Sequence, residues 1–384
     1  MSDETLLIPA ETRGVESIRW DEGRAAAGDS AIALSVADMD FKAPAAVVSA
    51  VTQRAAMGNY CYTYWTDDYY DAVTAWFASR HQWNIDRQAI VPVGRMVESL
   101  PAILREVVGE GARVVVPYPA YSPTPQAIKA ANCHVVPWLL DLHDGVYSMD
   151  MDKLRELLRD AQALVITNPH NPTGRVWTQD ELAAVAHVAD EFGTLVISDE
   201  FHADLVHSGH RFHPYLLSAG DTKRAISFTS PGKTFNMAGL ETGNIIVPDE
   251  SLRQKVRKAI DDAGCHNPRF FAQAATVAGY RHSGAWLDEL LALVSQHVAL
   301  LREATASIDG VDLIEPEGTY LAWLDFRASG LDDEQLESRL LSHGLVLTPG
   351  IEFGEGGSGF MRINLAVPTA ELTEALRRVA AAMH

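Results

Sequence analysis

Four polar side chains follow short hydrophobic runs of the chain. Asn171, Asp199, His202 and Lys233 each lie within a few residues of the end of a β-branched run that predicts a buried strand. Ligands of open α/β sheets gather beyond the carboxyl ends of the strands, so we expect these side chains to meet in one crevice. A lysine amine can form an imine with an aldehyde, and a carboxylate can hold a protonated ring nitrogen. A lone loop lysine is usually solvated, so only the combination indicates chemistry.

Pyridoxal 5'-phosphate (PLP) is a cofactor that needs this combination of groups. Lys233 would form the imine with the cofactor, and Asp199 would keep the pyridine nitrogen protonated so that the ring can accept carbanion electrons. The Asn171 amide would be oriented at the ring hydroxyl. The sequence therefore predicts a PLP-dependent enzyme.

The segments that must position these groups alternate regularly between about residues 90 and 250. Longer segments of helical period separate five short runs that predict strands at 113–117, 163–167, 194–198, 225–229 and 244–247. Thr178 and Glu181 predict a capping box at the start of one helix, and Gly193 predicts its end. This alternation favours an α/β fold with a mainly parallel sheet and helices on both faces.

The character of the chain changes after about residue 280. Helical segments are expected at 286–308, 332–343 and 369–383, with strand-like runs at 320–324 and 360–365. This pattern predicts a smaller α+β domain over residues 281–384, next to a large cofactor domain over residues 44–280. Residues 1–43 are too few to fold alone and are expected to form an arm that joins the small domain.

Composition excludes several classes of partner. The 384 residues include 31 Lys and Arg against 51 Asp and Glu, a net charge of -20, which argues against a nucleic acid or an anionic membrane as partner. Cys61, Cys133 and Cys265 are scattered singly, so a disulfide framework is not indicated. Neither a signal peptide nor a membrane-spanning run is evident, and we expect a cytoplasmic protein.

Several motifs together resemble a known superfamily. Asn168-Pro-His-Asn-Pro-Thr-Gly174, Ser198-Asp-Glu, Ser230-x-x-Lys233 and a late Arg362 resemble the fold-type I aminotransferase superfamily over nearly the whole chain. More narrowly, four segments resemble the carbon–sulfur β-lyases of the MalY/PatB type, the cystathionine β-lyases: Val36-Ala-Asp-Met-Asp-Phe41, Tyr62-Thr-Tyr-Trp-Thr-Asp67, Ser198-Asp-Glu-Phe-His-Ala-Asp204 and Lys233-Thr-Phe-Asn-Met-Ala-Gly-Leu240. The resemblance implies the aspartate aminotransferase fold and PLP as cofactor.

The resemblance also implies how the cofactor would be held. Tyr121 matches the aromatic residue that stacks on the cofactor ring. His202 would lie near the same ring oxygen as Asn171. Tyr62 resembles the tyrosine that reaches from the partner subunit to the phosphate or substrate, which implies a homodimer with shared active sites.

The phosphate would bind at the start of a helix that follows Gly94. Backbone N–H groups of Arg95 and Met96 would meet the anion there, and the Ser230 hydroxyl would add a donor. Two departures are visible. Many aminotransferases have an arginine eight residues after the lysine, where this chain has Glu241, and Gly94-Arg-Met stands where Gly-Val-Val is expected. The role of the Arg95 side chain stays open.

Arg362 is the candidate for the substrate carboxylate, because its planar fork matches a carboxylate bidentately. Asp38, with Asp40, would position the amino-terminal loop over the substrate, although a capping or turn role fits both residues equally well.

Two other patterns carry no function. Gly354-Glu-Gly-Gly-Ser-Gly359 matches G-x-G-x-x-G, but it precedes a strand-like run instead of opening a helix, so a dinucleotide site is not expected. His202, His207, His210 and His213 fit no standard zinc spacing, and no metal is expected.

The resemblance implies an α,β-elimination on an amino-acid substrate. L-Cystathionine, or a related S-substituted cysteine, would give a thiol such as homocysteine, together with pyruvate and ammonia. An aminotransferase would use the same groups and differ only in the step after carbanion formation, so it is the alternative. A third possibility is a regulator that keeps the fold and contacts another protein.

Overall fold

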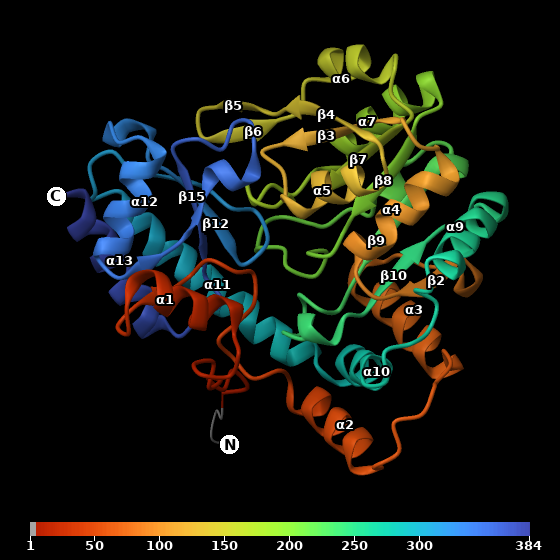
Figure 1. Cartoon of the computed structure of the whole chain (residues 1–384), viewed down its shortest axis with the longest axis horizontal. Helices are drawn as coiled ribbons and strands as arrows, with labels where there is room; N and C mark the ends of the chain where they lie inside the picture. Colours follow the sequence, from red (N-terminus) through yellow and green to blue (C-terminus); the bar gives the residue numbers. More distant parts are fainter. Residues whose placement is uncertain (1–4) are drawn as a thin grey trace.

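The computed structural model describes residues 5–384 and is built around a seven-stranded sheet (Figure 1). In spatial order its strands are β2 (Ile90–Val93), β10 (Gly243–Ile246), β9 (Ala225–Thr229), β8 (Leu195–Asp199), β7 (Ala163–Thr167), β3 (Arg113–Tyr118) and β4 (His134–Leu139). All five predicted runs are therefore confirmed as strands of one sheet.

The sheet is mainly parallel, as predicted, with one reversed strand. β10 is antiparallel to both of its neighbours, β2 and β9, and the remaining neighbours are parallel. A parallel connection needs a crossover of a dozen or more residues, usually a helix. The loop between β9 and β10 contains only one short turn of 3-10 helix, at Ala238–Leu240, and folds straight back. This returning loop carries Lys233.

Helices cover both faces of the large sheet, which confirms the predicted fold class. Val114 and Val116 of β3 pack on one side, while Val115 between them packs on the other, as the period of two in a strand requires. The first side is covered by α4 (Met96–Val107), α5 (Pro123–Ala130) and α9 (Glu250–Asp262). The second side is covered by α6 (Met151–Leu158), α7 (Gln179–Phe192) and α8 (Tyr215–Ser218).

Helix α7 begins and ends as its sequence predicts. The Thr178 side chain accepts a hydrogen bond from the Glu181 N–H at 3.2 Å, and the Glu181 carboxylate accepts one from the Thr178 N–H at 2.8 Å. Gly193 follows the helix with a φ of +64°, a conformation that glycine adopts without steric cost. These local signals set the length of the helix that separates β7 from β8.

Three further helices lie together below β10 and β2 in the view of Figure 1. Helices α2 (Ala45–Ala56) and α3 (Asp67–His81) both pack against α10 (Ala272–His282). A small hairpin of β5 (Asp141–His143) and β6 (Val146–Ser148) follows β4.

A second, antiparallel sheet is built from the later part of the chain. Its strands are β11 (Asp312–Ile314), β12 (Leu321–Asp325), β15 (Phe360–Asn364) and β14 (Thr348–Pro349). The three predicted helices are confirmed as α11 (Gly284–Thr305), α12 (Asp333–Ser342) and α13 (Thr369–Met383). Their ends differ from the prediction by a few residues at most, which is where helix assignments are least certain from sequence.

The amino-terminal segment runs beside the second sheet. It contains a π-helical turn η1 (Ile18–Glu22), α1 (Gly23–Ala27) and β1 (Ile32–Ala33), which pairs in parallel with β13 (Leu345–Val346). The division of the chain at residues 43 and 280 stays a prediction, and residues 1–4 of the expected arm lie outside the described residues. Within residues 5–384, no helix has the length and apolar character needed to cross a membrane.

Candidate active site

A cavity of about 560 Å³ lies at the carboxyl edge of the large sheet. Two successive reversals, from β9 to β10 and from β10 to β2, place the carboxyl end of β2 at the same edge as those of β3, β7, β8 and β9. The loops after these five strands therefore converge. The predicted site residues that line the cavity are Arg95, Met96, Tyr121, Asn171, Asp199, His202, Ser230, Lys233 and Arg362.

Lys233 and Asp199 line the same cavity, and their pKa values are shifted in opposite directions. Burial lowers the pKa of Lys233 to about 8, and nearby Asp38 opposes that shift. Burial raises the pKa of Asp199 to about 6, although its carboxylate accepts the Phe201 N–H at 3.2 Å and feels the charge of Lys233. Asp199 is 7% exposed, so a cation placed beside it would favour the ionised form of its carboxylate. Within residues 5–384, the pair thus offers an amine that loses its proton readily and a carboxylate that has no cationic partner in contact.

His202 and Tyr121 also line the cavity, with a polar and an aromatic side chain respectively. His202 is buried on the turn after β8, and burial lowers its pKa to about 3, so the ring is neutral at pH 7. Among the residues that the structure describes, its Nδ1 has no hydrogen-bond partner. Tyr121 follows β3, and burial raises its pKa above the ordinary value, which keeps the phenol protonated. Both rings line the space expected for a flat ligand.

Arg362 reaches the cavity from β15 of the second sheet. Its Nη1 donates to Asn171 Oδ1 at 3.0 Å, and its Nη2 donates to the Ser35 carbonyl at 2.8 Å. Its Nε has no partner within residues 5–384 and therefore remains as a donor for a ligand. Burial lowers the pKa of Arg362 to about 10, so the guanidinium stays charged at neutral pH. The contact with Asn171 joins two predicted site residues from different sheets.

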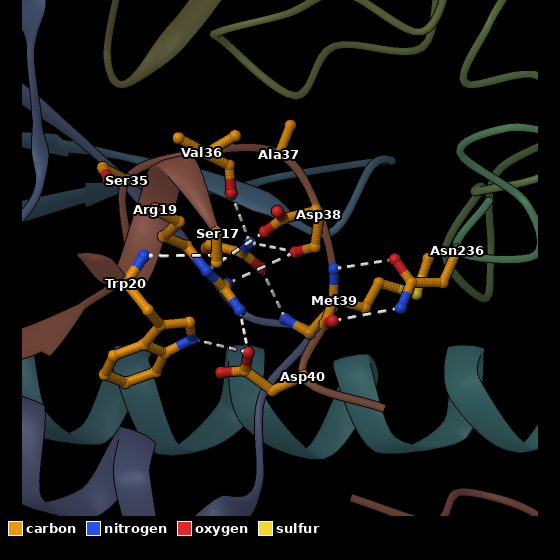
Figure 2. A network of polar contacts seen from close by, with 12 residues as sticks. Ser17, Arg19, Trp20, Ser35, Val36, Ala37, Asp38, Met39, Asp40 and Asn236 are labelled. Atoms are coloured by element: carbon orange, nitrogen blue, oxygen red, sulfur yellow. Dashed lines mark hydrogen bonds and ion pairs between the residues drawn. The ribbon is translucent and has the colours of Figure 1, made fainter. Parts of the chain in front are cut away.

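Residues 35–41, which we call the strap, contribute Ser35, Val36 and Ala37 to the lining of the cavity. Lys233 Nζ and the Tyr320 hydroxyl both donate to the Ala37 carbonyl, the latter at 2.9 Å. Asn364 donates to the Val36 carbonyl at 2.7 Å, and the Asn236 side chain contacts the backbone of Met39 at 3.1 and 3.0 Å (Figure 2). The strap is therefore held from the lysine loop on one side and from the second sheet on the other.

The Arg19 side chain lies between the two carboxylates of the strap, Asp38 and Asp40 (Figure 2). Its side chain is 1% exposed, pairs with Asp38 through Nε at 3.0 Å and also pairs with Asp40. Asp40 in addition accepts the Trp20 Nε1–H at 2.8 Å. A guanidinium buried at this depth needs such partners, because an uncompensated charge would be costly. Asp38 and Asp40 thus form ion pairs with Arg19, a contact that neither the positioning role nor the capping or turn role predicted, and Asp38 does not itself line the cavity. A direct contact of Asp38 with substrate stays a prediction.

The expected phosphate end of the cavity is lined by Gly94 to Val97 and by Ser230. Helix α4 starts at Met96, and its N-cap residue Arg95 makes no capping hydrogen bond with its side chain. The first N–H groups of a helix have no partner within it, so they are available to an anion. The Ser230 hydroxyl donates to the Thr242 carbonyl at 2.6 Å and would have to turn to reach a phosphate.

Glu241 and Arg95 stand at the two places where the sequence departs from the pattern expected of the family, and their side chains contact each other. Its carboxylate pairs with Arg95 Nε at 3.3 Å and with Arg269 Nη2 at 3.2 Å. Both arginines also contact Glu98, at 2.7 and 3.2 Å. Two guanidinium groups therefore lie near this end of the cavity even though no arginine follows Lys233 at the expected position.

Tyr62, like Asp38, is a predicted site residue that does not line its own chain's cavity. It is 96% exposed on the segment between α2 and α3. Its neighbours Tyr60 and Tyr64 are exposed as well. A role for Tyr62 at the active site would therefore require a second copy of the chain.

The two patterns set aside from the sequence have ordinary structural roles. The segment 354–359 is a loop that leads into β15, as predicted. Buried His207 contacts the carbonyls of Pro316 and Thr319 at 2.9 and 2.7 Å. Within residues 5–384, no three His, Cys, Asp or Glu side chains are grouped so as to hold a metal ion.

The sequence interpretation missed the residues that hold the strap. None of the three residues Arg19, Tyr320 and Asn364 belongs to a motif quoted for the family. Tyr320 and Asn364 also lie 283 and 328 residues from the strap residues that they contact. Asn236 could have been chosen from the sequence, because it lies in the segment from Lys233 to Leu240 that resembles the C–S lyases.

Comparisons with known proteins agree with this geometry. The family described as aminotransferase class I and II matches residues 29–379. Cystathionine β-lyase PatB of Bacillus subtilis is 36% identical, over 97% of this chain and 98% of its own. Protein MalY of Escherichia coli is 31% identical over 88% of both chains. The crystal structure of cystalysin from Treponema denticola, which contains PLP, superposes with a TM-score of 0.93 at 30% identity over 98% of both chains. The chain therefore belongs to the class I and II aminotransferase family and, within it, to the group that contains PatB and MalY.

Proposed function

We propose that the protein is a PLP-dependent carbon–sulfur β-lyase that acts on L-cystathionine or a related S-substituted cysteine. The observation that carries the proposal is the placement of Lys233, Asp199 and Arg362 around one cavity. The lyase assignment is supported by PatB, which is named a cystathionine β-lyase, and PLP is supported by cystalysin, which contains it.

The cavity residues fit PLP. Asp199 is a buried acid without a contacting cation among the described residues, which suits a protonated ring nitrogen. The unpartnered His202 Nδ1 suits a polar ring substituent, and the start of α4 suits a phosphate. The volume of about 560 Å³ lies within the usual range of roughly 300–1,000 Å³ for small-molecule sites.

Each residue then has a defined task. When bound, PLP supplies a ring that accepts the electron pair left at the substrate Cα. Lys233 Nζ takes the Cα proton as a general base, a role for which a pKa of about 8 is suited. Asp199 keeps the ring nitrogen protonated, and Arg362 orients the substrate by its carboxylate.

The reaction breaks the Cα–H and Cβ–S bonds of the substrate. The thiolate leaves from Cβ and takes up a proton, and water finally replaces the amine at Cα. L-Cystathionine and one water thus give homocysteine, pyruvate and ammonia. The aminotransferase alternative begins with the same proton transfer but retains the Cβ–S bond.

Product analysis tests the proposal. The purified protein with PLP is incubated with L-cystathionine in the absence of any keto acid, and pyruvate and free thiol are measured. The lyase releases both in equal amounts over many turnovers. A second incubation contains a keto acid as well. Transfer of the amino group to that keto acid without release of thiol would establish an aminotransferase instead.

Replacing Arg362 by lysine is expected to weaken substrate binding more than turnover. Lysine keeps the charge but loses the planar fork, so KM for cystathionine should rise by roughly 100-fold while kcat changes much less. Arg327→Lys, which alters an exposed arginine paired with Asp325, is the matched control. An unchanged KM in Arg362→Lys would contradict the assignment of the carboxylate site.

We also propose a homodimer in which Tyr62 of each protomer reaches the cavity of the other. The exposure of Tyr62 and its absence from the lining of its own cavity support this arrangement. Tyr62→Ala and Lys233→Ala should each be nearly inactive. Mixed dimers of the two variants keep one intact site, so a random mixture should regain about a quarter of the wild-type activity. If no activity returns in mixtures that demonstrably contain hybrid dimers, Tyr62 does not act across the interface.

We further propose a cytoplasmic location. Cys61, Cys133 and Cys265 are all free thiols, and Cys61 is exposed. Exposed free thiols are typical of proteins in a reducing compartment.

A further inference from the structure

A second buried polar cluster lies directly behind Lys233. The Asp204 carboxylate is buried and has three polar neighbours: Trp76 Nε1 at 2.9 Å, His81 Nε2 at 2.6 Å and Thr234 Oγ1 at 2.7 Å. Because an ionised carboxylate only accepts, these three groups act as donors to it. Thr234 is the residue next to Lys233 in the chain.

The cluster joins the three segments that position the catalytic groups. Trp76 and His81 belong to α3, Asp204 ends the turn that follows Asp199 and contains His202, and Thr234 lies in the lysine loop after β9. Asp204 is thus bonded to the loop of Lys233 while it lies five residues after Asp199 in the chain. The distance between the amine and the acid depends on how these two segments are held together.

Charge and packing both favour a well-ordered cluster. Burial alone would raise the pKa of Asp204, but the contacts with His81, Thr234 and Trp76 outweigh burial and lower it. Phe235, which follows Thr234, packs edge-on against Trp76 and Tyr280 at centroid distances of 5.5 and 5.9 Å. Buried networks in which every member is satisfied rigidify their surroundings.

We propose that Asp204 is a positioning residue, which holds the lysine loop through the Thr234 hydroxyl and thereby sets the orientation of Lys233 toward Asp199. The inference rests on the proposed function, because it assumes that Lys233 attaches PLP and transfers the Cα proton. His81 and Trp76 secure Asp204 from α3. Asp204 touches neither substrate nor cofactor in this role and acts only through Thr234.

The test compares isosteric changes at two threonines of the same segment. Thr234→Val removes the hydroxyl that contacts Asp204, whereas Thr229→Val removes a buried hydroxyl that has no hydrogen-bond partner within residues 5–384. The readouts are the rate at which PLP attaches to the apoprotein, followed by near-visible absorbance, and the values of kcat and KM for cystathionine.

Thr234→Val is expected to slow attachment and lower kcat by roughly tenfold each, with KM changed less than about twofold, because misorientation affects the reacting amine and not substrate binding. Thr234→Ser, which restores the hydroxyl, should recover both rates, and Thr229→Val should retain both. A merely structural role would lower the unfolding temperature of Thr234→Val and leave both rates unchanged.

Rates in Thr234→Val equal to the wild type would overturn the inference, as would a serine variant as slow as the valine variant. If Thr234→Val does not fold, Trp76→Phe removes one donor to Asp204 without changing the lysine loop, and an unchanged attachment rate there overturns the inference. A wild-type protein that never becomes coloured with PLP contradicts the proposed function itself, so the two failures are distinguishable.

Discussion

Lys233→Ala is expected to lower kcat for cystathionine by at least about 10⁴-fold, because one change removes both the covalent attachment of the cofactor and the general base. The near-visible absorbance of the protein-bound cofactor should be lost at the same time. The variant should nevertheless fold. A lysine whose pKa is lowered by folding is destabilised in the folded chain, so its removal is not expected to lower the unfolding temperature.

The pH dependence of labelling provides an independent check of the Lys233 environment. The neutral amine is the reactive form, so trapping of PLP on the apoprotein by borohydride should rise with pH and reach half its maximum near pH 8, the pKa expected for Lys233. Lys258 is the internal control, because its contacts with Asp262 and Glu106 raise its pKa to about 12. Peptide mapping distinguishes the two sites. A midpoint above pH 10 at Lys233 would contradict a buried, destabilised amine.

Asp199→Asn is expected to lower kcat by roughly 100- to 1,000-fold while the cofactor still attaches. Asparagine keeps the size of the side chain and an oxygen for the Phe201 N–H, but it carries no charge to hold a protonated ring nitrogen. The ring then accepts the carbanion electrons poorly, whereas substrate binding through Arg362 is unaffected. Steady-state kinetics should therefore show a lower kcat and nearly the same KM.

Glu200→Gln is the matched control, since Glu200 is the adjacent buried acid of the same segment. Glu200 contacts the Ser198 hydroxyl at 2.9 Å and the Tyr215 N–H at 2.8 Å and does not line the cavity. Burial raises its pKa to about 8, so it is protonated at pH 7 and glutamine matches its charge. Activity near wild type is expected for this variant. Equal losses in the two variants would indicate a general effect on the turn instead of a specific role for Asp199.

Much of the catalytic edge of the large sheet was predictable because its signals are local. The β-branched runs identify β3, β7, β8 and β9, and the polar groups follow directly at their carboxyl ends. The capping box at Thr178 and the left-handed Gly193 set a helix of the length that a parallel crossover requires. Parallel strands present their carboxyl ends at one edge, so Asn171, Asp199 and Lys233 had to converge once the sheet was mainly parallel.

Long-range contacts decided the rest, because no periodicity or motif reports which distant segments will meet. Helix or strand period predicts an element, but not that a loop of 13 residues between β9 and β10 reverses β10 and carries Lys233. The strap is held by Tyr320 and Asn364, which lie almost 300 residues or more from it along the chain.

The sequence likewise does not predict the role of a residue whose surroundings come from other segments of the chain. Buried Arg19 depends on carboxylates of the strap, Asp204 depends on donors of α3 more than 120 residues away, and exposed Tyr62 takes no part in the lining of its own cavity. The amino-acid sequence thus determined the chemical groups, the strands that carry them and the edge where they meet. Tertiary structure alone decided how those groups are oriented and enclosed, since orientation depends on buried hydrogen bonds between segments that the chain order keeps apart.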